Sequence, residues 1–252
     1  MSSIDMHGQV ALVAGASRGI GAATAEAFAA AGAAVVLAAR DLAALQAVAG
    51  RIEAGGGRAL AVRADVTDAG SVRGLVDQAL AAYGRLDAAF NNAMAGPRPA
   101  PLADVDLAEF DEGIAASIRG TFLGMKFQVP AMLRTGGGAI VNMASIAGLQ
   151  GTANLAAYVA GKAGIIGLTK VAALDYADAG VRVNVVAPGP ILTHHLAAAG
   201  PEAQRLAGLS TPMRRTGTAA EVADVVLWLC SAGSSFVTGA VIPVDGGIWA
   251  AT

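Results

Sequence analysis

The sequence of 252 residues predicts an α/β fold, with a single domain over residues 1–252. In this fold a doubly wound parallel sheet of about seven strands carries helices on both faces. Short apolar runs alternate with segments of helical spacing along the whole chain, which is typical of strand–helix–strand units. Most of these runs are apolar throughout, as expected for strands covered on both faces. Hydrophobic residues make up 55% of the chain, which is enough to fill one large core.

The expected strands share continuous apolar sequence. In chain order they are 10–14, 34–39, 59–63, 86–90, 139–143, 182–187 and 240–244. Helices are expected from the turn after Ala14 to about residue 31, over 41–54, from 67 or 68 to 83 or 84, and over 104–133, 156–179 and 219–231. Apolar residues recur at helical spacing in 41–54, and the side chain of Thr67 or Asp68 can cap the helix that follows. The segment 188–212 is expected to be irregular, with short helical pieces.

The charge pattern and the first residues argue against several classes of protein. The net charge is −2 and no Lys and Arg cluster is present, so we expect no nucleic-acid partner. Residues 1–9 lack the basic and apolar pattern of a signal sequence, and no uninterrupted apolar run reaches about 18 residues. We therefore expect a cytoplasmic protein without a membrane span. Cys230 is the only cysteine, which excludes an intrachain disulfide.

A glycine-rich turn joins the first expected strand to the first helix. Its glycines allow a tight turn and let a pyrophosphate approach the helix, whose first amides then face the phosphates. This arrangement is typical of a Rossmann dinucleotide-binding fold. The residues predicted to bind the cofactor here are Gly15, Ser17, Arg18, Gly19, Ile20 and Gly21. A turn that only packs the helix on the sheet is the alternative, which its position directly after the first strand disfavours.

The residues after the second expected strand indicate which cofactor binds. NAD sites usually place a carboxylate there for the ribose hydroxyls, but this chain has Ala39 followed by Arg40. A guanidinium can pair with a 2′-phosphate that a carboxylate would repel, and Arg18 adds a second positive charge. We therefore predict NADP(H), against the alternative that both arginines are solvated surface residues. Asp65 is expected to meet the adenine, and Asn91 to line the floor of the cleft.

Three further side chains predict proton-transfer chemistry. Tyr158 and Lys162 lie on one face of their expected helix, and Ser145 follows the fifth strand, whose carboxyl end opens on a cofactor cleft in a doubly wound sheet. Reducing a ketone needs a proton for its oxygen, and a phenol with a pKa of about 10 exchanges protons poorly at neutral pH. A neighbouring ammonium lowers that pKa by favouring the phenolate. The alternative is a half-buried aromatic ring beside a lysine whose amine reaches solvent.

With these motifs the sequence resembles the short-chain dehydrogenase/reductase family from residue 9 to residue 247. The resemblance rests on Gly15, Gly19, Gly21, Asp65, Val66, Asn91, Asn92, Ala93, Asn142, Ser145, Tyr158, Lys162, Asn184, Pro188, Gly189, Thr193, Thr238, Gly239, Asp245, Gly246 and Gly247. It implies that Ser145 binds the carbonyl, that Tyr158 is the acid/base, and that Lys162 tunes the phenol and binds the ribose.

The resemblance also implies further cofactor contacts. They are Val66, Asn91, Ala93, Pro188, Gly189, Ile191 and Thr193, of which the last four border the nicotinamide. A substrate lid is implied over residues 190–212. A homotetramer paired through long helices and C-terminal segments is implied as the assembly.

Three positions depart from the family pattern. Ala14 replaces a Thr before the first glycine, and Met94 replaces a Gly, which brings a larger side chain to the cleft. Ser117 stands where the long helix usually carries an Asn thought to hold a water that feeds protons towards the lysine. We include Ser117 in the catalytic set as a candidate relay residue.

The combined prediction is an NADP(H)-dependent alcohol dehydrogenase or carbonyl reductase that interconverts a ketone and a secondary alcohol on a small organic substrate. A 3-oxoacyl thioester on an acyl-carrier protein is the alternative substrate. It is disfavoured because the helix after Lys162 mixes Lys170 with Asp175 and Asp178, whereas an acidic carrier needs a basic rim.

A cofactor-binding sensor without turnover is the alternative from another class. It is disfavoured because Tyr158 and Lys162 are both retained. No metal site is expected, because the adjacent His194 and His195 point apart and a metal needs converging ligands.

Overall fold

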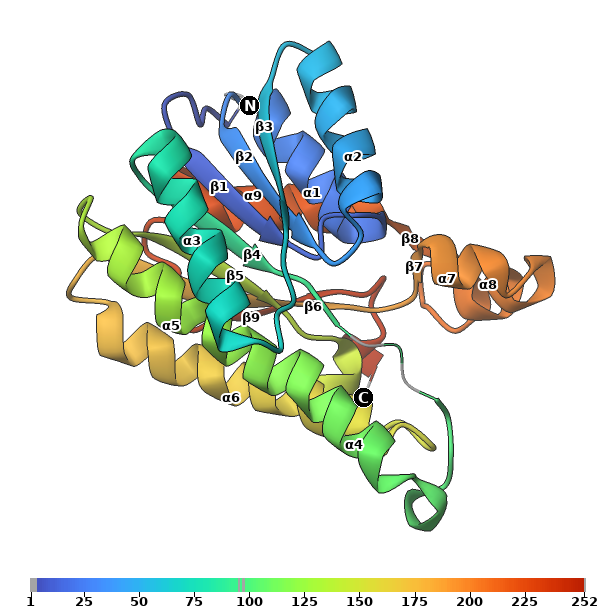
Figure 1. The fold of residues 1–252 in the computed structure, drawn as a ribbon. Helices are drawn as coiled ribbons and strands as arrows, with labels where there is room; N and C mark the ends of the chain where they lie inside the picture. The colour runs from blue at the N-terminus through green and yellow to red at the C-terminus, as the bar shows by residue number, and fades with distance from the viewer. Residues whose placement is uncertain (1–3, 95, 97, 252) are drawn as a thin grey trace.

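The computed structural model describes residues 4–94, 96 and 98–251. Its centre is a seven-stranded parallel sheet with helices on both faces, in the order β3-β2-β1-β4-β5-β6-β9 (Figure 1). The strands are β1 (Val10–Ala14), β2 (Ala34–Ala39), β3 (Arg58–Arg63), β4 (Ala88–Asn91), β5 (Gly138–Met143), β6 (Val181–Pro188) and β9 (Val241–Val244). The predicted fold class is confirmed, and each of these strands begins and ends within two residues of its expected bounds.

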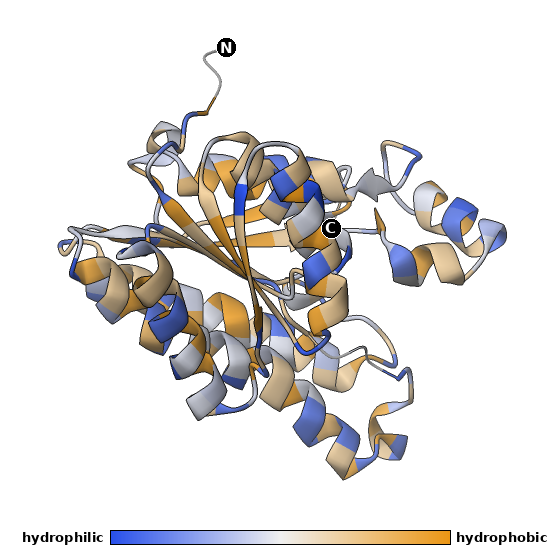
Figure 2. Cartoon of the chain, turned by 45° about the horizontal axis from the view of Figure 1, so that its top comes forward, coloured by the Kyte–Doolittle hydropathy of each residue, from blue (hydrophilic) through white to orange (hydrophobic). Residues whose placement is uncertain are grey.

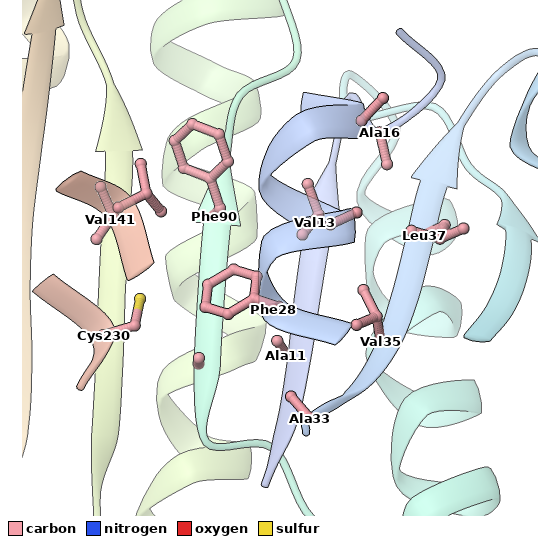
Figure 3. Packing of buried hydrophobic residues seen from close by; sticks show 14 of the residues in the cluster. Ala11, Val13, Ala16, Phe28, Ala33, Val35, Leu37, Phe90, Val141 and Cys230 are labelled. Atoms are coloured by element: carbon pink, nitrogen blue, oxygen red, sulfur yellow. The ribbon is translucent and has the colours of Figure 1, made fainter. Parts of the chain in front are cut away.

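Two layers of helices cover the sheet. The helices on one face are α1 (Gly19–Ala30), α2 (Leu42–Ala54) and α9 (Ala219–Cys230). Those on the other face are α3 (Ala69–Tyr83), α5 (Gly120–Leu133) and α6 (Ala156–Tyr176). Hydrophobic residues run along the central strands between these layers (Figure 2). In the first layer, the fully buried Phe28 of α1 lies over the strands that carry Val13 and Phe90 (Figure 3).

The order of the strands places the site. The chain runs outward from β1 to β2 and β3, and then crosses to β4 on the other side of β1. The connections at the carboxyl ends of β1 and β4 therefore leave the sheet in opposite directions. Ligands of open α/β sheets bind in the crevice that forms at such a switch point.

The long helix expected over 104–133 is interrupted. The structure has a 3-10 turn η1 (Leu102–Asp104), then α4 (Leu107–Ile114), then a π-helical turn η2 (Ala115–Arg119), and only then α5. Asp106 caps α4 through its side chain, which accepts hydrogen bonds from the amides of Ala108 and Glu109. The π turn holds Ser117. Apolar spacing does not reveal such a turn, because it adds one residue without ending the helix.

Helix α6 combines a buried side with an exposed apolar side. Among the described helices it is the one with the length and composition of a membrane span, with a mean hydropathy of 1.3, and 33% of that stretch is buried. In the structure α6 packs against β6 and β5 of the sheet. Its bound at Tyr176 comes three residues before the expected end.

The predicted lid segment forms a helical arm. It starts with β7 (Ile191–Leu192), continues through α7 (His194–Ala198) and α8 (Pro201–Leu209), and returns to β8 (Gly217–Thr218). Parallel pairing of β7 with β8 closes the base of the arm. The two helices stand out from the sheet on the side where β7 and β8 lie (Figure 1).

Candidate active site

The glycine-rich turn lies between β1 and α1 at the carboxyl edge of the sheet. Gly15 and Gly19 have positive φ angles of 80° and 56°, a region that favours glycine. A Cβ atom on Gly15 would lie 2.9 Å from the Cα atom of Ala93, and one on Gly21 would lie 2.1 Å from the carbonyl oxygen of Gly15. Close packing of the turn on α1 and on the segment after β4 therefore requires glycine at positions 15 and 21.

The first turn of α1 presents backbone donors at this edge. Arg18 precedes the helix in extended conformation, and its side chain makes no capping hydrogen bond. The first amides of a helix have no carbonyl partner within that helix, and they carry a partial positive charge. The turn from Ser17 to Ile20 therefore fits the pyrophosphate of a dinucleotide.

Arg40 and Asp65 lie near each other beyond the ends of β2 and β3. Hydrogen bonds from the backbone and hydroxyl of Thr67 hold the pKa of Asp65 below its usual value, and the positive charge of Arg40 adds to this effect. The nitrogen and Oγ1 of Thr67 lie 2.9 and 2.7 Å from Oδ1 of Asp65, so this oxygen is bound within its own loop. Arg40 is exposed directly after Ala39, the last residue of β2.

Asn91, the last residue of β4, lies in a buried hydrogen-bond network. Its Nδ2 donates to Oε1 of Gln128 at 3.1 Å and to Oδ1 of Asn142 at 2.9 Å, and its Oδ1 accepts from Nε2 of Gln128 at 2.8 Å. Asn142 continues the network to Thr169 on α6. The amide of Asn91 is thus fully occupied in a buried network that ties β4 and β5 to α5 and α6. Buried polar groups need such partners, and a contact of Asn91 with the cofactor stays a prediction.

Asn92 is a site residue that the sequence reasoning did not select. Its Nδ2 donates to the carbonyl oxygen of Gly15 at 3.1 Å and so ties the end of β4 to the glycine turn. The consecutive asparagines were the available signal, since alternate residues of a strand face opposite sides. Val66 also lies near this edge, where its side chain packs against Gly120 at the start of α5.

Ser145 and Tyr158 meet at the carboxyl end of β5. Ser145 begins the 3-10 turn η3 (Ile146–Gly148), and its Oγ accepts a hydrogen bond from the amide of Ala147 at 3.2 Å. The hydroxyl of Ser145 lies beside the phenol of Tyr158. Burial raises the pKa of Tyr158 above its usual value, and the hydrogen bond with Ser145 offsets part of that rise.

Lys162 lies next to the phenol and is only 1% exposed. Its Nζ donates to the carbonyl oxygen of Met143 at 2.8 Å and lies 5.6 Å from the centre of the Tyr158 ring. Burial lowers the pKa of Lys162 to about 7. The expectation of a lowered phenol pKa is wrong for this structure, because burial disfavours the phenolate by more than the interaction with Ser145 favours it. The predicted convergence of the two side chains is present.

Ser117 lies in the π turn and is 6% exposed. Its Oγ donates to the carbonyl oxygen of Gly113 at 2.5 Å, one turn earlier in the same helix. Its single proton is therefore committed to its own helix. A role for Ser117 as a proton relay stays a prediction.

The segment after β6 forms the far side of the cleft. Oγ of Ser145 lies 3.5 Å from the carbonyl oxygen of Pro188. A Cβ atom on Gly189 would lie 2.9 Å from Cα of Asp245, so this turn approaches the end of β9 closely. A Cβ atom on Gly19 would lie 3.6 Å from Cγ2 of Thr193, which places Thr193 opposite the glycine turn. The neighbouring Ile191 is buried in β7.

The segment after Asn92 contains an exposed apolar side chain and an ion pair. Met94 is exposed, and the nearby Arg98 forms an ion pair of 2.8 Å with Glu109. His194 and His195 begin α7. No group of three or more metal-ligating His, Cys, Asp or Glu side chains occurs within the described part of the chain.

A hollow of about 350 Å³ lies at the base of the arm. It is lined by Leu209, Ser210, Thr211, Pro212, Arg214, Ile248 and Ala251. This hollow joins the end of α8 to the C-terminal segment. Neither Tyr158 nor Lys162 lines it, so it does not replace their cleft as the candidate site.

Comparison with known proteins identifies the family. A family model described as enoyl-(acyl carrier protein) reductase matches residues 15–249. A crystal structure of a short-chain type dehydrogenase/reductase from Mycobacterium marinum is 38% identical, with a TM-score of 0.91, and the match covers 97% of this chain and 96% of that one. The chain belongs to the short-chain dehydrogenase/reductase family.

Two further matches describe what relatives of this short-chain dehydrogenase/reductase do. A cyclohexanol dehydrogenase of Acinetobacter sp. (strain SE19) is 42% identical over 240 residues, which is 95% of this chain and 94% of that protein. A 7α-hydroxysteroid dehydrogenase complexed with NADH and 7-oxo glycochenodeoxycholic acid is 33% identical with a TM-score of 0.92, over 97% of this chain and 96% of that one. As a member of this family, the chain is an oxidoreductase that binds NAD(P)(H).

Proposed function

We propose that this short-chain dehydrogenase/reductase uses NADP(H) to interconvert a ketone and a secondary alcohol on a small cyclic organic molecule. The observation that carries the proposal is the convergence of Ser145, Tyr158 and Lys162, with the buried Nζ of Lys162 beside the phenol ring. These side chains stand at the same sheet edge as the glycine turn. The cyclohexanol and hydroxysteroid dehydrogenases among its relatives support a cyclic alcohol as substrate.

The side chains supply what carbonyl reduction requires. The bound dinucleotide supplies a hydride to the carbonyl carbon. The hydroxyls of Ser145 and Tyr158 hold the carbonyl oxygen by hydrogen bonds, which stabilise the negative charge that develops on it. Because burial raises the pKa of Tyr158, the phenol is protonated at neutral pH and is ready to donate its proton to that oxygen.

Lys162 acts on the state left by that proton transfer. The phenolate of Tyr158 is a buried anion, and an ammonium 5.6 Å from the ring centre stabilises it. The carbonyl oxygen of Met143 holds Nζ at this place. In the direction of alcohol oxidation, the same phenolate accepts the proton of the substrate hydroxyl.

The choice of NADP(H) rests on charge at the end of β2. Ala39 offers no carboxylate to the ribose hydroxyls, and the exposed guanidinium of Arg40 follows it. Hydrogen bonds from Thr67 and, to a smaller extent, the positive charge of Arg40 lower the pKa of Asp65, so Arg40 lies close to this loop. Arg18 stands on the other side, at the start of α1. These charges favour a 2′-phosphate.

An acyl-carrier-protein thioester is the second candidate substrate, since the matching family model is described by such an activity. Oxidation of NADPH, followed by its absorbance, tests both candidates with a panel of cyclic ketones, diketones and 3-oxoacyl thioesters. We expect turnover of cyclic ketones, and the Tyr158→Phe variant should lose about 10²–10⁴-fold in kcat. Turnover of thioesters alone would favour the second candidate. Binding of NADPH with no turnover of any compound would indicate a cofactor-binding sensor without catalytic activity.

We also propose that the protein assembles as a homotetramer. Large apolar side chains remain exposed on α5 and α6, where Phe122 is 46%, Val171 55% and Leu174 82% exposed. Phe236, after α9, is also fully exposed. Exposed apolar surface of this kind marks a site of association.

A further inference from the structure

The catalytic helix α6 is crossed at very short distance by α4 and its π turn. A Cβ atom on Gly161 of α6 would lie 2.2 Å from Oγ of Ser117 and 3.0 Å from its Cβ. One turn earlier, a Cβ atom on Gly113 of α4 would lie 3.1 Å from the Cβ of Ala157. The crossing therefore depends on glycine, because any side chain at 161 would have to displace Ser117.

The π turn determines where the hydroxyl of Ser117 stands. The turn spans residues 115–119, and Ser117 within it is buried. Its Oγ donates to the carbonyl oxygen of Gly113 at 2.5 Å, which fixes the rotamer of the side chain. A serine bonded to the preceding turn in this way is a rigid contact rather than a mobile one.

A second close contact lies at the next residue of α6. A Cβ atom on Gly148, at the end of the 3-10 turn that Ser145 begins, would lie 2.7 Å from the backbone carbon of Lys162. The helix is thus held at adjacent residues, by the π turn at Gly161 and by the turn of Ser145 at Lys162. Tyr158 lies one helical turn before Lys162, so any displacement of α6 here moves both side chains relative to Ser145.

We propose that Ser117 and Gly161 are positioning residues, whose contact sets the place of Tyr158 and Lys162 relative to Ser145. The proposal rests on the proposed function, and it assigns Ser117 a geometric role that needs no transfer of its proton. π turns often occur at functional sites, and here the extra residue carries the contact.

The decisive variant is Gly161→Ala, which introduces the Cβ that the contact excludes. A displacement of about 1 Å at a catalytic group lowers turnover by about 100-fold, so we expect kcat to fall by about 10- to 100-fold. The pKa of the Tyr158 phenol should rise, because the hydrogen bond from Ser145 that lowers it is weakened. Adding Ser117→Gly removes both atoms that the new Cβ would meet, and it should restore kcat and the phenol pKa towards the wild-type values.

Two glycines of the same helix supply matched controls. A Cβ atom on Gly164 would lie 2.6 Å from Cδ1 and 2.9 Å from Cγ1 of Ile118, whose flexible side chain can turn away. A Cβ atom on Gly167 would meet nothing within 4 Å. Gly164→Ala and Gly167→Ala should therefore keep the kcat and the phenol titration of the wild type. Should Gly161→Ala not fold, Ser117→Ala tests the same contact by removing Oγ, with a smaller effect in the same direction.

The phenol titration separates this proposal from the proposed function. Ionisation of Tyr158 is followed by ultraviolet absorbance against pH, with the Tyr158→Phe chain subtracted, and it needs no substrate. A titration and a kcat unchanged in Gly161→Ala would overturn the positioning role. A titration that moves and is restored by Ser117→Gly, in a protein that reduces no carbonyl compound, would support the contact while refuting the proposed function.

Discussion

The pKa of Lys162 differs strongly from the value of a lysine in water. Lys162 is 1% exposed, and burial lowers its pKa to about 7. Tyr158 next to it has a raised pKa for the same reason. Burial therefore disfavours the charged form of both groups, and perturbed pKa values of this kind cluster at functional sites. A lysine close to a phenol is not enough to predict the pKa of the phenol. Burial disfavours the charged form of both groups, which raises the pKa of the phenol and lowers that of the amine.

The burial of Lys162 predicts a pH-dependent stability. Its folded pKa is near 7 and the unfolded value is 10.5, so between these values the unfolded chain binds more protons and the folded form gains stability as the pH rises. Wild type should gain on the order of a few kcal/mol relative to Lys162→Met between pH 7 and pH 10. Urea unfolding of both proteins at several pH values measures this difference. A constant difference would contradict the burial of a titrating amine.

Substitution of Arg40 tests the proposed preference for NADP(H). The Arg40→Asp variant should lose about 10- to 100-fold in kcat/KM with NADPH, because a hydrogen-bonded charge contributes about 1.5–3 kcal/mol. It should gain with NADH, since a carboxylate can bind the ribose hydroxyls. Steady-state kinetics with both cofactors measure the change. Arg134→Ala, which follows α5 at the opposite edge of the sheet, is the control. A wild-type preference for NADH would refute the assignment.

Among the elements, α9 shows how local sequence and packing agree. Thr218 and Glu221 form a capping box, in which the Thr218 side chain accepts from the Glu221 amide and the Glu221 side chain accepts from the Thr218 amide. Arg215 pairs with Glu221 at 2.6 Å and, with these bonds, holds the pKa of Glu221 at about 2. The cap fixes the start of the helix that packs beside α1. It therefore supports the helix that carries the glycine turn.

Loss of this cap should be measurable. Thr218→Ala removes the oxygen that accepts from Glu221, at a cost of about 1 kcal/mol in the free energy of unfolding. Thr218→Ser keeps that oxygen and should stay close to wild type. The midpoints of urea unfolding compare the three proteins. Equal midpoints for Thr218→Ala and Thr218→Ser would show that the cap contributes nothing.

At the scale of the whole molecule, α5 and α6 expose large apolar side chains to solvent. Only 33% of the apolar stretch of α6 is buried, although its inner side packs on the sheet. Leu174 and Val171 belong to the uncovered side. A second copy of the chain would cover these side chains with matching surface and thereby remove them from water.

Charge placed on this surface should reduce the size of the assembly. We expect wild type to have the mass of four 24.8 kDa chains by light scattering, and Val171→Lys with Leu174→Lys to shift it to a smaller species. Gln78→Lys, on the exposed side of α3, adds charge elsewhere and should leave the mass unchanged. A monomeric wild type would refute the proposed assembly.

Sequence alone determined the features that depend on local pattern. Continuous apolar runs predicted each strand of the sheet, because a strand covered on both faces admits few polar residues. The spacing of Tyr158 and Lys162 predicted that they share a helix face, and the glycines predicted the tight turn at α1. These features follow from the periodicity of side chains along a helix or strand and from the backbone freedom of glycine, which are local properties of the chain.

Only the tertiary structure decided the features that depend on contacts with residues distant in the sequence. The side chain of Asn91 belongs to a buried hydrogen-bond network because Gln128 and Asn142 are its partners. The side chain of Asn92 binds the glycine turn instead. The π turn brought Ser117 against Gly161, and burial reversed the expected direction of the phenol's pKa. Hydrogen-bond partners and exclusion of water are set by residues distant in sequence, so no local pattern contains them.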